Sequence, residues 1–259
     1  MRPTDAPPRA HERAPDVAPS AAAEPASRPS GRSELPRHVA IIMDGNRRWA
    51  RQRGVPELEG HSAGVEAIRG LLRHAVRRGI QVLTLYAFSR ENWARTDEEV
   101  VGLFGLLEAA IRSETAELRA QGVHVQLIGR ADELPPETRR SIDSALEATA
   151  SGDGLILNIA FNYAGRTELV DAIRRIVRTG VPADEIDEST VARALYTGDL
   201  PDPDLVIRTG GEQRLSNFLI WQSAYAELYT TETLWPDFGS DGLDAALAEY
   251  ATRTRRFGR

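Results

Sequence analysis

From Leu35 onward, short apolar runs rich in β-branched residues alternate with longer segments whose apolar residues recur at helical spacing. Strands of a parallel sheet are apolar on both faces, and helices usually connect them. The alternation therefore predicts a single α/β domain with a central, largely parallel sheet flanked by helices. The expected strands are His38–Met43, Gln81–Phe88, Val123–Ile128, Leu155–Phe161, Leu205–Arg208 and Phe218–Trp221.

Two of the segments between these strands have distinct helical patterns. Residues 65–76 present one apolar face. A second helix, capped by Thr96 or Asp97, is apolar over more than one narrow stripe. Burial in the core would explain the wide stripe, and a wall of an apolar pocket is the alternative.

Residues 1–34 differ in composition from everything that follows. They consist mainly of Pro, Ala, Ser and Arg, and Val17 is their single large aliphatic residue. Such a segment cannot bury enough apolar surface to offset the entropy lost on ordering. We expect a disordered leader over 1–34 and a folded domain over 35–259, with organelle targeting as an alternative role for the leader.

The composition excludes several kinds of chemistry. All 32 basic residues are arginine, and the chain has neither lysine nor cysteine. Schiff-base catalysis, a P-loop lysine, thiolate nucleophiles, Cys-ligated metals and disulfides are therefore excluded. The net charge of −6 argues against general nucleic-acid binding. No stretch approaches the ~20 apolar residues of a membrane span, and no secretory signal is recognisable, so we expect a cytoplasmic protein.

The first polar motif directly follows the first expected strand. Asp44 is followed by a turn at Gly45 and Asn46, and then by a segment with helix-forming residues. Open α/β sheets bind ligands at the carboxyl ends of their strands, so Asp44 stands where a catalytic or metal-binding carboxylate is expected. Backbone N–H groups after the turn, with Arg47 and Arg48, would suit a phosphate. The plain alternative is a turn in which Asp44 caps the helix.

A second motif follows the strand Gln81–Phe88. It places a hydroxyl, a carboxylate, an amide, an indole and two guanidinium groups within a short segment: Ser89, Arg90, Glu91, Asn92, Trp93 and Arg95. This polar variety is unusual for a loop that only connects two elements. We therefore predict a binding role, with an ordinary loop as the alternative.

A third motif, over residues 204–217, contains the expected strand Leu205–Arg208 and the polar residues that follow it. Two glycines allow backbone to approach an anion closely, and Arg208 and Arg214 flank them. In a chain without lysine, a diphosphate must be held by guanidinium groups, backbone amides, hydroxyls, histidine or a metal. Glu227 offers a carboxylate that could join Asp44 around Mg²⁺, although a solvated or paired glutamate is the plain alternative.

Residues 60–64 match the G-x-S-x-G pattern of hydrolase nucleophile elbows. That motif requires a strand immediately before it, but residues 55–59 contain a proline and two glutamates. We therefore reject a serine hydrolase. His61 is interpreted as an imidazole that faces a ligand.

The polar motifs and the segments around them resemble those of a known family. The segments His38–Ala50, Phe88–Arg95, Asn158–Arg166 and Arg208–Asp237 are similar to those of cis-prenyltransferases, particularly bacterial undecaprenyl diphosphate synthases. The resemblance implies a homodimer whose sheet and helices enclose a hydrophobic tunnel. It also implies Mg²⁺-dependent, repeated addition of isopentenyl diphosphate to an allylic diphosphate, with new Z double bonds. The polyprenyl product would be delivered to a membrane, and the enzyme could be peripheral to it.

The resemblance also implies roles for the motif residues. Asp44 would be catalytic and, with Glu227, would hold Mg²⁺. Asn92 lies at the position linked to proton removal, but a neutral amide is a poor base and would instead position a water or a diphosphate oxygen. The allylic diphosphate would contact Gly45, Asn46, Arg47, Arg48, Trp49 and His61. A substrate loop would be formed by Ser89, Arg90, Glu91, Trp93 and Arg95. Isopentenyl diphosphate would be bound by Arg208, Arg214, Leu215 and Ser216.

The clearest departure from the family pattern is Glu57, which stands where members usually carry an arginine near the allylic diphosphate. We expect a carboxylate there to repel the diphosphate, so that Glu57→Arg would lower the allylic KM. Arg51 or Arg53 could compensate by reaching into the site.

Product length follows from weaker signals. Ala87 and Leu155 align with tunnel positions, and the helix over 96–121 has no added segment, which favours a chain of roughly C50 to C55. Alternatives are a short C15 product, an irregular prenyl diphosphate synthase, or a non-catalytic partner subunit. The last would be expected to lack residues such as Asp44, Asn92 and Arg208, which this chain keeps.

Overall fold

The computed structural model describes residues 35–198 and 200–253, so the predicted leader lies outside the described residues. One six-stranded sheet has the order β3-β4-β2-β1-β5-β6, and every neighbouring pair is parallel. The predicted α/β fold is thereby confirmed. The strands are β1 (His38–Ile42), β2 (Val82–Ser89), β3 (His124–Ile128), β4 (Ile156–Tyr163), β5 (Leu205–Arg208) and β6 (Glu227–Thr230).

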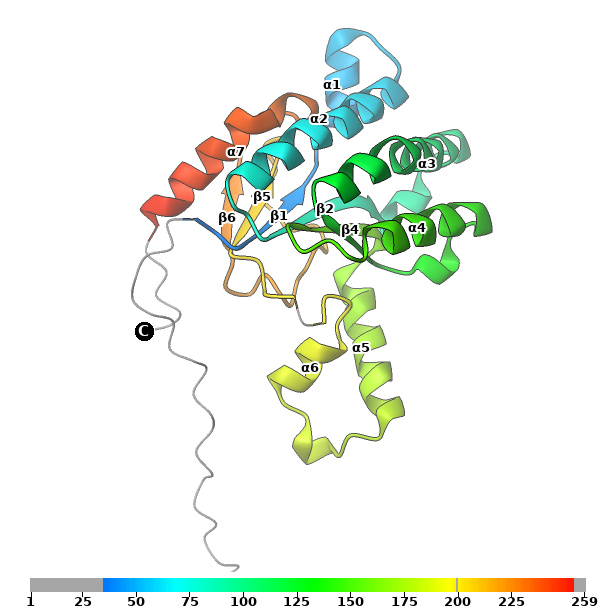
Figure 1. Cartoon of the computed structure of the whole chain (residues 1–259), viewed down its shortest axis with the longest axis vertical. Coiled ribbons are helices and arrows are strands. Elements are labelled where there is room, and N and C mark those ends of the chain that lie inside the picture. The colour runs from blue at the N-terminus through cyan, green and yellow to red at the C-terminus, as the bar shows by residue number, and fades with distance from the viewer. Residues whose placement is uncertain (1–34, 199, 254–259) are drawn as a thin grey trace, which may run out of the picture. The chain divides into compact units, whose positions relative to one another are not determined.

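Helices cover the two faces of the sheet unequally (Figure 1). One face carries α1 (Asn46–Arg53), α2 (Glu57–Arg77), α3 (Asp97–Ala120), α4 (Pro136–Thr149) and α7 (Trp235–Thr252). The other face carries α5 (Gly165–Thr179) and α6 (Glu188–Ala194), which extend away from the sheet. Short 3₁₀ turns are η1 (Arg90–Ala94), η2 (Ala131–Glu133) and η3 (Ala183–Glu185).

Five of the predicted strands are confirmed with small shifts at their ends, but Phe218–Trp221 is not a strand. That segment is a series of turns in which Leu219 has a φ of 42°, a conformation incompatible with extended pairing. Phe218 and Leu219 are nevertheless fully buried. The apolar run therefore indicated burial correctly and strand wrongly, and the sixth strand is the short, mixed-polarity edge segment Glu227–Thr230.

Two of the hydrophobic clusters lie between the sheet and the helices α2, α3, α4 and α7. Helices α2 and α7 bury Leu71, Trp235 and Leu243 against β-strand residues such as Ile41 and Leu83. Under α3, the aromatic rings of Phe88, Phe104 and Phe161 pack together in a separate cluster.

The wide apolar pattern of α3 is only partly explained by this core. Val100 and Phe104 are buried, whereas Leu103 and Leu107 are half-buried and Val101 is 71% exposed. Complete burial in the core is therefore not the reason for the pattern.

A buried histidine ties β1 to its neighbours. His38 Nδ1 donates to the Pro201 carbonyl at 2.6 Å, and its Nε2 accepts from the Thr84 hydroxyl at 2.7 Å. These partners fix one neutral tautomer, because a carbonyl can only accept. Burial lowers the pKa of His38 to about 4.

Acidification should therefore weaken the fold through His38. The unfolded chain, with a histidine pKa near 6.5, takes up a proton that the folded chain excludes. The stabilisation from neutral His38 is complete above about pH 6.5 and is lost as the pH falls towards 4. Over this range the free energy of unfolding decreases by up to about 1.4 kcal/mol per pH unit. Urea unfolding at several pH values from 7.5 to 5 should show this, with a shallower pH dependence in His38→Asn. His124→Asn, a control on β3, should keep the wild-type slope; a His38→Asn slope equal to wild type would contradict the assignment.

Candidate active site

The carboxyl ends of β1 and β5 are joined by a buried hydroxyl. Thr209 Oγ1 donates to the Asp44 carbonyl at 2.6 Å and accepts from the Asp44 backbone N–H at 2.9 Å. Gly45, with a φ of 113°, then turns the chain into α1. A Cβ atom at this position would lie 2.8 Å from Leu234, so both the angle and the space require glycine. The turn holds the Asp44 carboxylate at the edge of the sheet.

An arginine meets that carboxylate from the next strand. Arg208, only 4% exposed, donates from Nη2 to Asp44 Oδ2 at 2.8 Å. Its Nη1 donates to Ser216 Oγ at 2.7 Å and to the Arg214 carbonyl. Arg48 approaches the other Asp44 oxygen at 3.4 Å. The structure thus brings together residues predicted from the first and third motifs.

The turn after Arg214 is held in an unusual backbone conformation. Ser216 and Asn217 have φ values of 49° and 63°, a region that non-glycine residues seldom adopt. The Asn217 side chain accepts from the Arg166 N–H at 2.9 Å and donates to Glu91 Oε1 at 2.8 Å. These bonds hold the turn open towards Arg208 and join it to the second motif.

The second motif forms η1, and Asn92 shapes it. Asn92 Oδ1 accepts from the Ser89 backbone N–H at 3.0 Å in a capping box. Trp93 Nε1 donates to Asn162 Oδ1 at 2.9 Å, and Arg90 pairs with Glu133. The Asn92 side-chain oxygen already accepts one hydrogen bond, whereas Nδ2 has no hydrogen-bond partner within 35–198 and 200–253 and is available to a ligand. This favours a donor role over that of a base.

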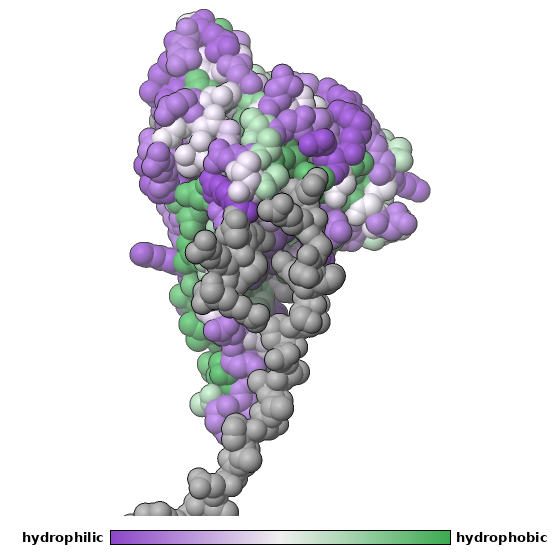
Figure 2. Space-filling model, turned by 90° about the vertical axis from the view of Figure 1, so that its left-hand side faces the viewer, coloured by the Kyte–Doolittle hydropathy of each residue, from purple (hydrophilic) through white to green (hydrophobic). Residues whose placement is uncertain are grey.

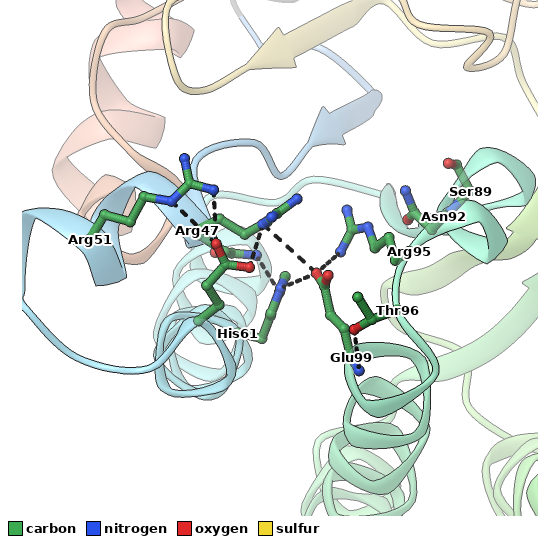
Figure 3. Close-up of polar contacts among 10 residues, drawn as sticks. Arg47, Arg51, His61, Ser89, Asn92, Arg95, Thr96 and Glu99 are labelled. Atoms are coloured by element: carbon green, nitrogen blue, oxygen red, sulfur yellow. Dashed lines mark hydrogen bonds and ion pairs between the residues drawn. The ribbon is translucent and has the colours of Figure 1, made fainter.

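Glu99, on the first turn of α3, connects three site residues that sequence reasoning treated separately (Figure 3). Its Oε1 lies 2.8 Å from Arg95 Nη1, 3.3 Å from His61 Nε2 and 4.0 Å from Arg47 Nε. Burial, and then the charge of Arg95, lowers the pKa of His61, so its imidazole is neutral at pH 7. Glu99 was missed because its place three residues after Thr96 reads as an ordinary capping box.

The G-x-S-x-G match lies inside α2, which confirms that it is no nucleophile elbow. Its glycines instead allow α1 to lie directly on α2. A Cβ atom at Gly64 would lie 2.6 Å from Asn46 Oδ1 and 2.9 Å from Trp235 Cδ1, and one at Gly60 would collide with the Asn46 carbonyl. His61, between these glycines, lies with Nδ1 3.5 Å from Asn46 Nδ2. The pattern serves close helix packing.

Two predicted site residues point elsewhere within this chain. Trp49 Nε1 donates to Asp237 on α7 at 2.8 Å, and Arg53 stacks on the indole at 4.0 Å from the ring centroid. Glu227 begins β6 in register with Leu205, at the amino end of β5, while Asp44 follows the carboxyl end of β1. The Glu227 carboxylate pairs with Arg253 at 2.9 Å.

These positions bear on the predicted Mg²⁺ site. Within one chain, Asp44 and Glu227 lie at opposite ends of their strands, so their joint binding of Mg²⁺ stays a prediction. No group of three or more histidine or acidic side chains in 35–198 and 200–253 is arranged to hold a metal ion. Asp44 alone still suits Mg²⁺, because this ion is commonly bound by one or two carboxylates together with substrate phosphates.

Comparisons with known proteins agree with this geometry. Residues 42–258 match a family model described as "Putative undecaprenyl diphosphate synthase". The isoprenyl transferase of Heliobacterium mobile is 49% identical, over 86% of this chain and 88% of its own. That of Porphyromonas gingivalis is 48% identical, over 87% and 90%.

Solved structures agree as well. Lavandulyl diphosphate synthase from Lavandula x intermedia, in complex with dimethylallyl diphosphate, superposes with a TM-score of 0.85 and 40% identity, over 87% of this chain and 99% of that one. A probable undecaprenyl diphosphate synthase from Campylobacter jejuni has a TM-score of 0.74 and 33% identity, over 86% and 99%.

Removing the Asp44 charge should destabilise the protein, because buried Arg208 would lose its counter-ion. Asp44 is about one third exposed, so water screens part of the loss. We expect Asp44→Asn to lower the free energy of unfolding by about 1–3 kcal/mol, below the ~3–5 kcal/mol of a fully buried pair. Denaturant unfolding measures this. Asp237→Asn, which breaks the exposed pair with Arg53, is the control and should cost under about 1 kcal/mol. Equal losses in the two variants would contradict the assigned importance of the Asp44–Arg208 pair.

Proposed function

The chain belongs to the undecaprenyl diphosphate synthase family of prenyltransferases, and from this premise we propose that it condenses isopentenyl diphosphate with an allylic diphosphate to give a Z-configured polyprenyl diphosphate. The family consists of enzymes that transfer prenyl groups. The observation that carries the proposal is the cluster of Asp44, Arg208 and Ser216 at the carboxyl ends of β1 and β5.

The cluster offers places for two diphosphates on either side of Asp44. On one side, the backbone amides that begin α1, with Arg47 and Arg48, suit the allylic diphosphate. On the other side, Arg208, Arg214 and Ser216 suit isopentenyl diphosphate. Arg208 Nε is buried and has no partner within 35–198 and 200–253, which leaves a donor in the site for a ligand or water. Guanidinium groups bind phosphate through parallel hydrogen bonds, so a lysine-free chain can hold both substrates.

The reaction breaks the C–O bond between the allyl group and its diphosphate. The double bond of isopentenyl diphosphate forms the new C–C bond, and one proton is then lost. Arg47, Arg48 and the α1 amides would stabilise the departing diphosphate through preorganised positive charge. When bound, Mg²⁺ supplies further neutralisation of the leaving group, and Asp44 is the residue that would hold it.

Proton removal is assigned to a phosphate oxygen or a water, because the chain offers no suitable base at Asn92. The Asn92 carbonyl is already engaged by Ser89, and a neutral amide does not accept a proton near pH 7. Its Nδ2, which has no hydrogen-bond partner among the described residues, would donate a hydrogen bond that orients the accepting oxygen. His61 is neutral but donates towards Glu99, so it is also occupied.

For product length, we propose a chain of roughly C50 to C55, supported by the description of the family model and by the C. jejuni structure, which both name an undecaprenyl diphosphate synthase. The tunnel that would hold it stays a prediction. The cluster of Phe88, Phe104 and Phe161 under α3 would have to shift for a long chain to pass there. The lavandulyl diphosphate synthase match supports an alternative, in which two allylic units are joined irregularly.

Incubating the full chain with Mg²⁺, labelled isopentenyl diphosphate and C5, C10, C15 or C20 allylic primers should yield labelled polyprenyl diphosphates. Asp44→Ala should lower turnover by about 10²-fold or more, because it removes a charge that acts on the leaving diphosphate. Asp241→Ala, an exposed carboxylate on α7, is the matched control and should keep wild-type turnover. Chelation of Mg²⁺ should stop the reaction reversibly.

Product chromatography separates the remaining outcomes. No incorporation with any primer would refute prenyl transfer, and a C15 limit would refute the C50 to C55 proposal. A product formed from dimethylallyl diphosphate alone would favour the irregular alternative.

We also propose that the chain forms a homodimer through α5. Val170, Ile173 and Val177 recur at helical spacing on this helix and are 45%, 57% and 71% exposed. Figure 2 shows hydrophobic surface along one edge of the lower part of the molecule, where Figure 1 places α5 and α6. Such an exposed apolar row usually marks an interaction surface.

Sedimentation of the purified chain should therefore give the mass of a dimer. Val177→Asp should shift the equilibrium towards monomer, because it would bury a charge in the interface. Val101→Asp, equally exposed but on α3, should leave the dimer intact. A monomeric wild-type chain, or a Val177→Asp dimer of unchanged stability, would rule out this surface.

A further inference from the structure

The sequence predicted that the Glu57 carboxylate would repel a diphosphate. In the structure, this carboxylate is not free. Its Oε2 accepts from Arg47 Nε at 2.6 Å, and its Oε1 accepts from Arg51 Nη2 at 2.8 Å and Nε at 3.2 Å. Of the two arginines expected to compensate for it, Arg53 instead pairs with Asp237. The two bound guanidinium groups outweigh the single negative charge of Glu57. The expected repulsion between Glu57 and a diphosphate is therefore offset by Arg47 and Arg51.

The ion pair with Glu57 uses the Nε edge of the Arg47 guanidinium group and leaves the opposite edge open. Only Nε of Arg47 is engaged, by Glu57 and more distantly by Glu99, in the part of the chain that the structure describes. Nη1 and Nη2 make no hydrogen bond there. The Nη pair is a fork that matches two phosphate oxygens. In Figure 3, Arg47 and Arg95 point towards one another from α1 and from the turn before α3.

The location of Arg47 links this open fork to the proposed leaving-group site. Arg47 is the second residue of α1, next to Arg48, whose guanidinium approaches Asp44 at 3.4 Å. Glu57 is the first residue of α2, and the glycines of α2 hold the two helices in contact. Two packed helix ends therefore fix the separation of Glu57 and Arg47.

Stability alone is a weak explanation for this pair. The Arg47 and Glu57 side chains are 44% and 33% exposed, and exposed ion pairs contribute little to folding. The pair does restrict a long side chain that otherwise samples many rotamers. Restricting it before a ligand arrives reduces the ordering cost of binding.

We propose that Glu57 is a positioning residue that holds the Arg47 guanidinium with its Nη fork towards the allylic diphosphate. The proposal rests on the proposed prenyl-transfer function for the identity of the ligand. It assigns to Arg47 the phosphate contact that an arginine at position 57 would otherwise provide. It also reverses the expectation for Glu57→Arg. This substitution should raise the allylic KM, because a third cation beside Arg47 and Arg51 would displace the Nη fork.

Steady-state kinetics of the full chain test this assignment. Glu57→Gln should raise the KM for the allylic diphosphate by about 3–10-fold, because Arg47 loses its charged partner, while the isopentenyl diphosphate KM stays within about twofold. Arg47→Gln should raise the allylic KM by about 10-fold or more, through loss of charge-assisted hydrogen bonds. The double variant should match Arg47→Gln, because Glu57 acts through Arg47.

Glu59→Gln, which removes a charge from the same helical turn, is the matched control and should keep both KM values. Glu57→Asp should recover part of the loss, since a shorter carboxylate still attracts Arg47. Additive effects of Glu57→Gln and Arg47→Gln, an unchanged allylic KM, or equal rises in both KM values would overturn the proposal.

A binding measurement separates this proposal from the proposed function. Titration calorimetry with inorganic diphosphate and Mg²⁺ requires no turnover, and Glu57→Gln should bind about 3–10-fold more weakly than Glu59→Gln. If wild type fails to transfer prenyl groups but this difference is present, the prenyl-transfer function fails and the positioning role stands. If turnover is normal and the two variants bind diphosphate equally, the positioning role fails alone.

Discussion

The ion pair between Asp44 and Arg208 is the interaction on which the rest of the site depends. It joins the carboxyl ends of β1 and β5, which are adjacent in the sheet but far apart in the chain. Arg208 is buried, so its charge requires a partner, and Asp44 supplies one while it stays partly exposed. The same guanidinium group orders Ser216 and the Arg214 carbonyl. One buried cation therefore sets the positions of the carboxylate proposed to be catalytic and of the turn proposed to bind phosphate.

Close packing of α1 on α2 is the second constraint. Gly60 and Gly64 allow the Asn46 backbone and side chain to approach α2. That approach places Arg47 beside Glu57. The contact of α2 with α3 places His61 beside Glu99. At the proposed site, carboxylates also orient the guanidinium groups. Glu57 and Glu99 act in this way on Arg47 and Arg95.

Much of the fold was predictable from the sequence because buried parallel strands have a simple signature. β1, β2, β4 and β5 are largely apolar, and the polar motifs after β1, β2 and β5 lie at the expected edge of the sheet. This signature failed where a buried segment is not a strand and where a strand is not apolar. Phe218 and Leu219 are buried in turns, and β6 is an edge strand of mixed polarity. The register of β6 against β5 decided the position of Glu227, and no local sequence pattern encodes that register.

The sequence by itself determined the fold class, the polar motifs and the absence of lysine and cysteine chemistry, because these depend on residue type and short-range periodicity. The tertiary structure decided which of those residues meet. It brought Asp44 to Arg208, occupied the Asn92 carbonyl, and turned Glu57 from an expected repulsive charge into a partner of Arg47. Pairings of this kind depend on strand order, helix packing and side-chain geometry across long sequence separations, so composition and spacing along the chain could not fix them.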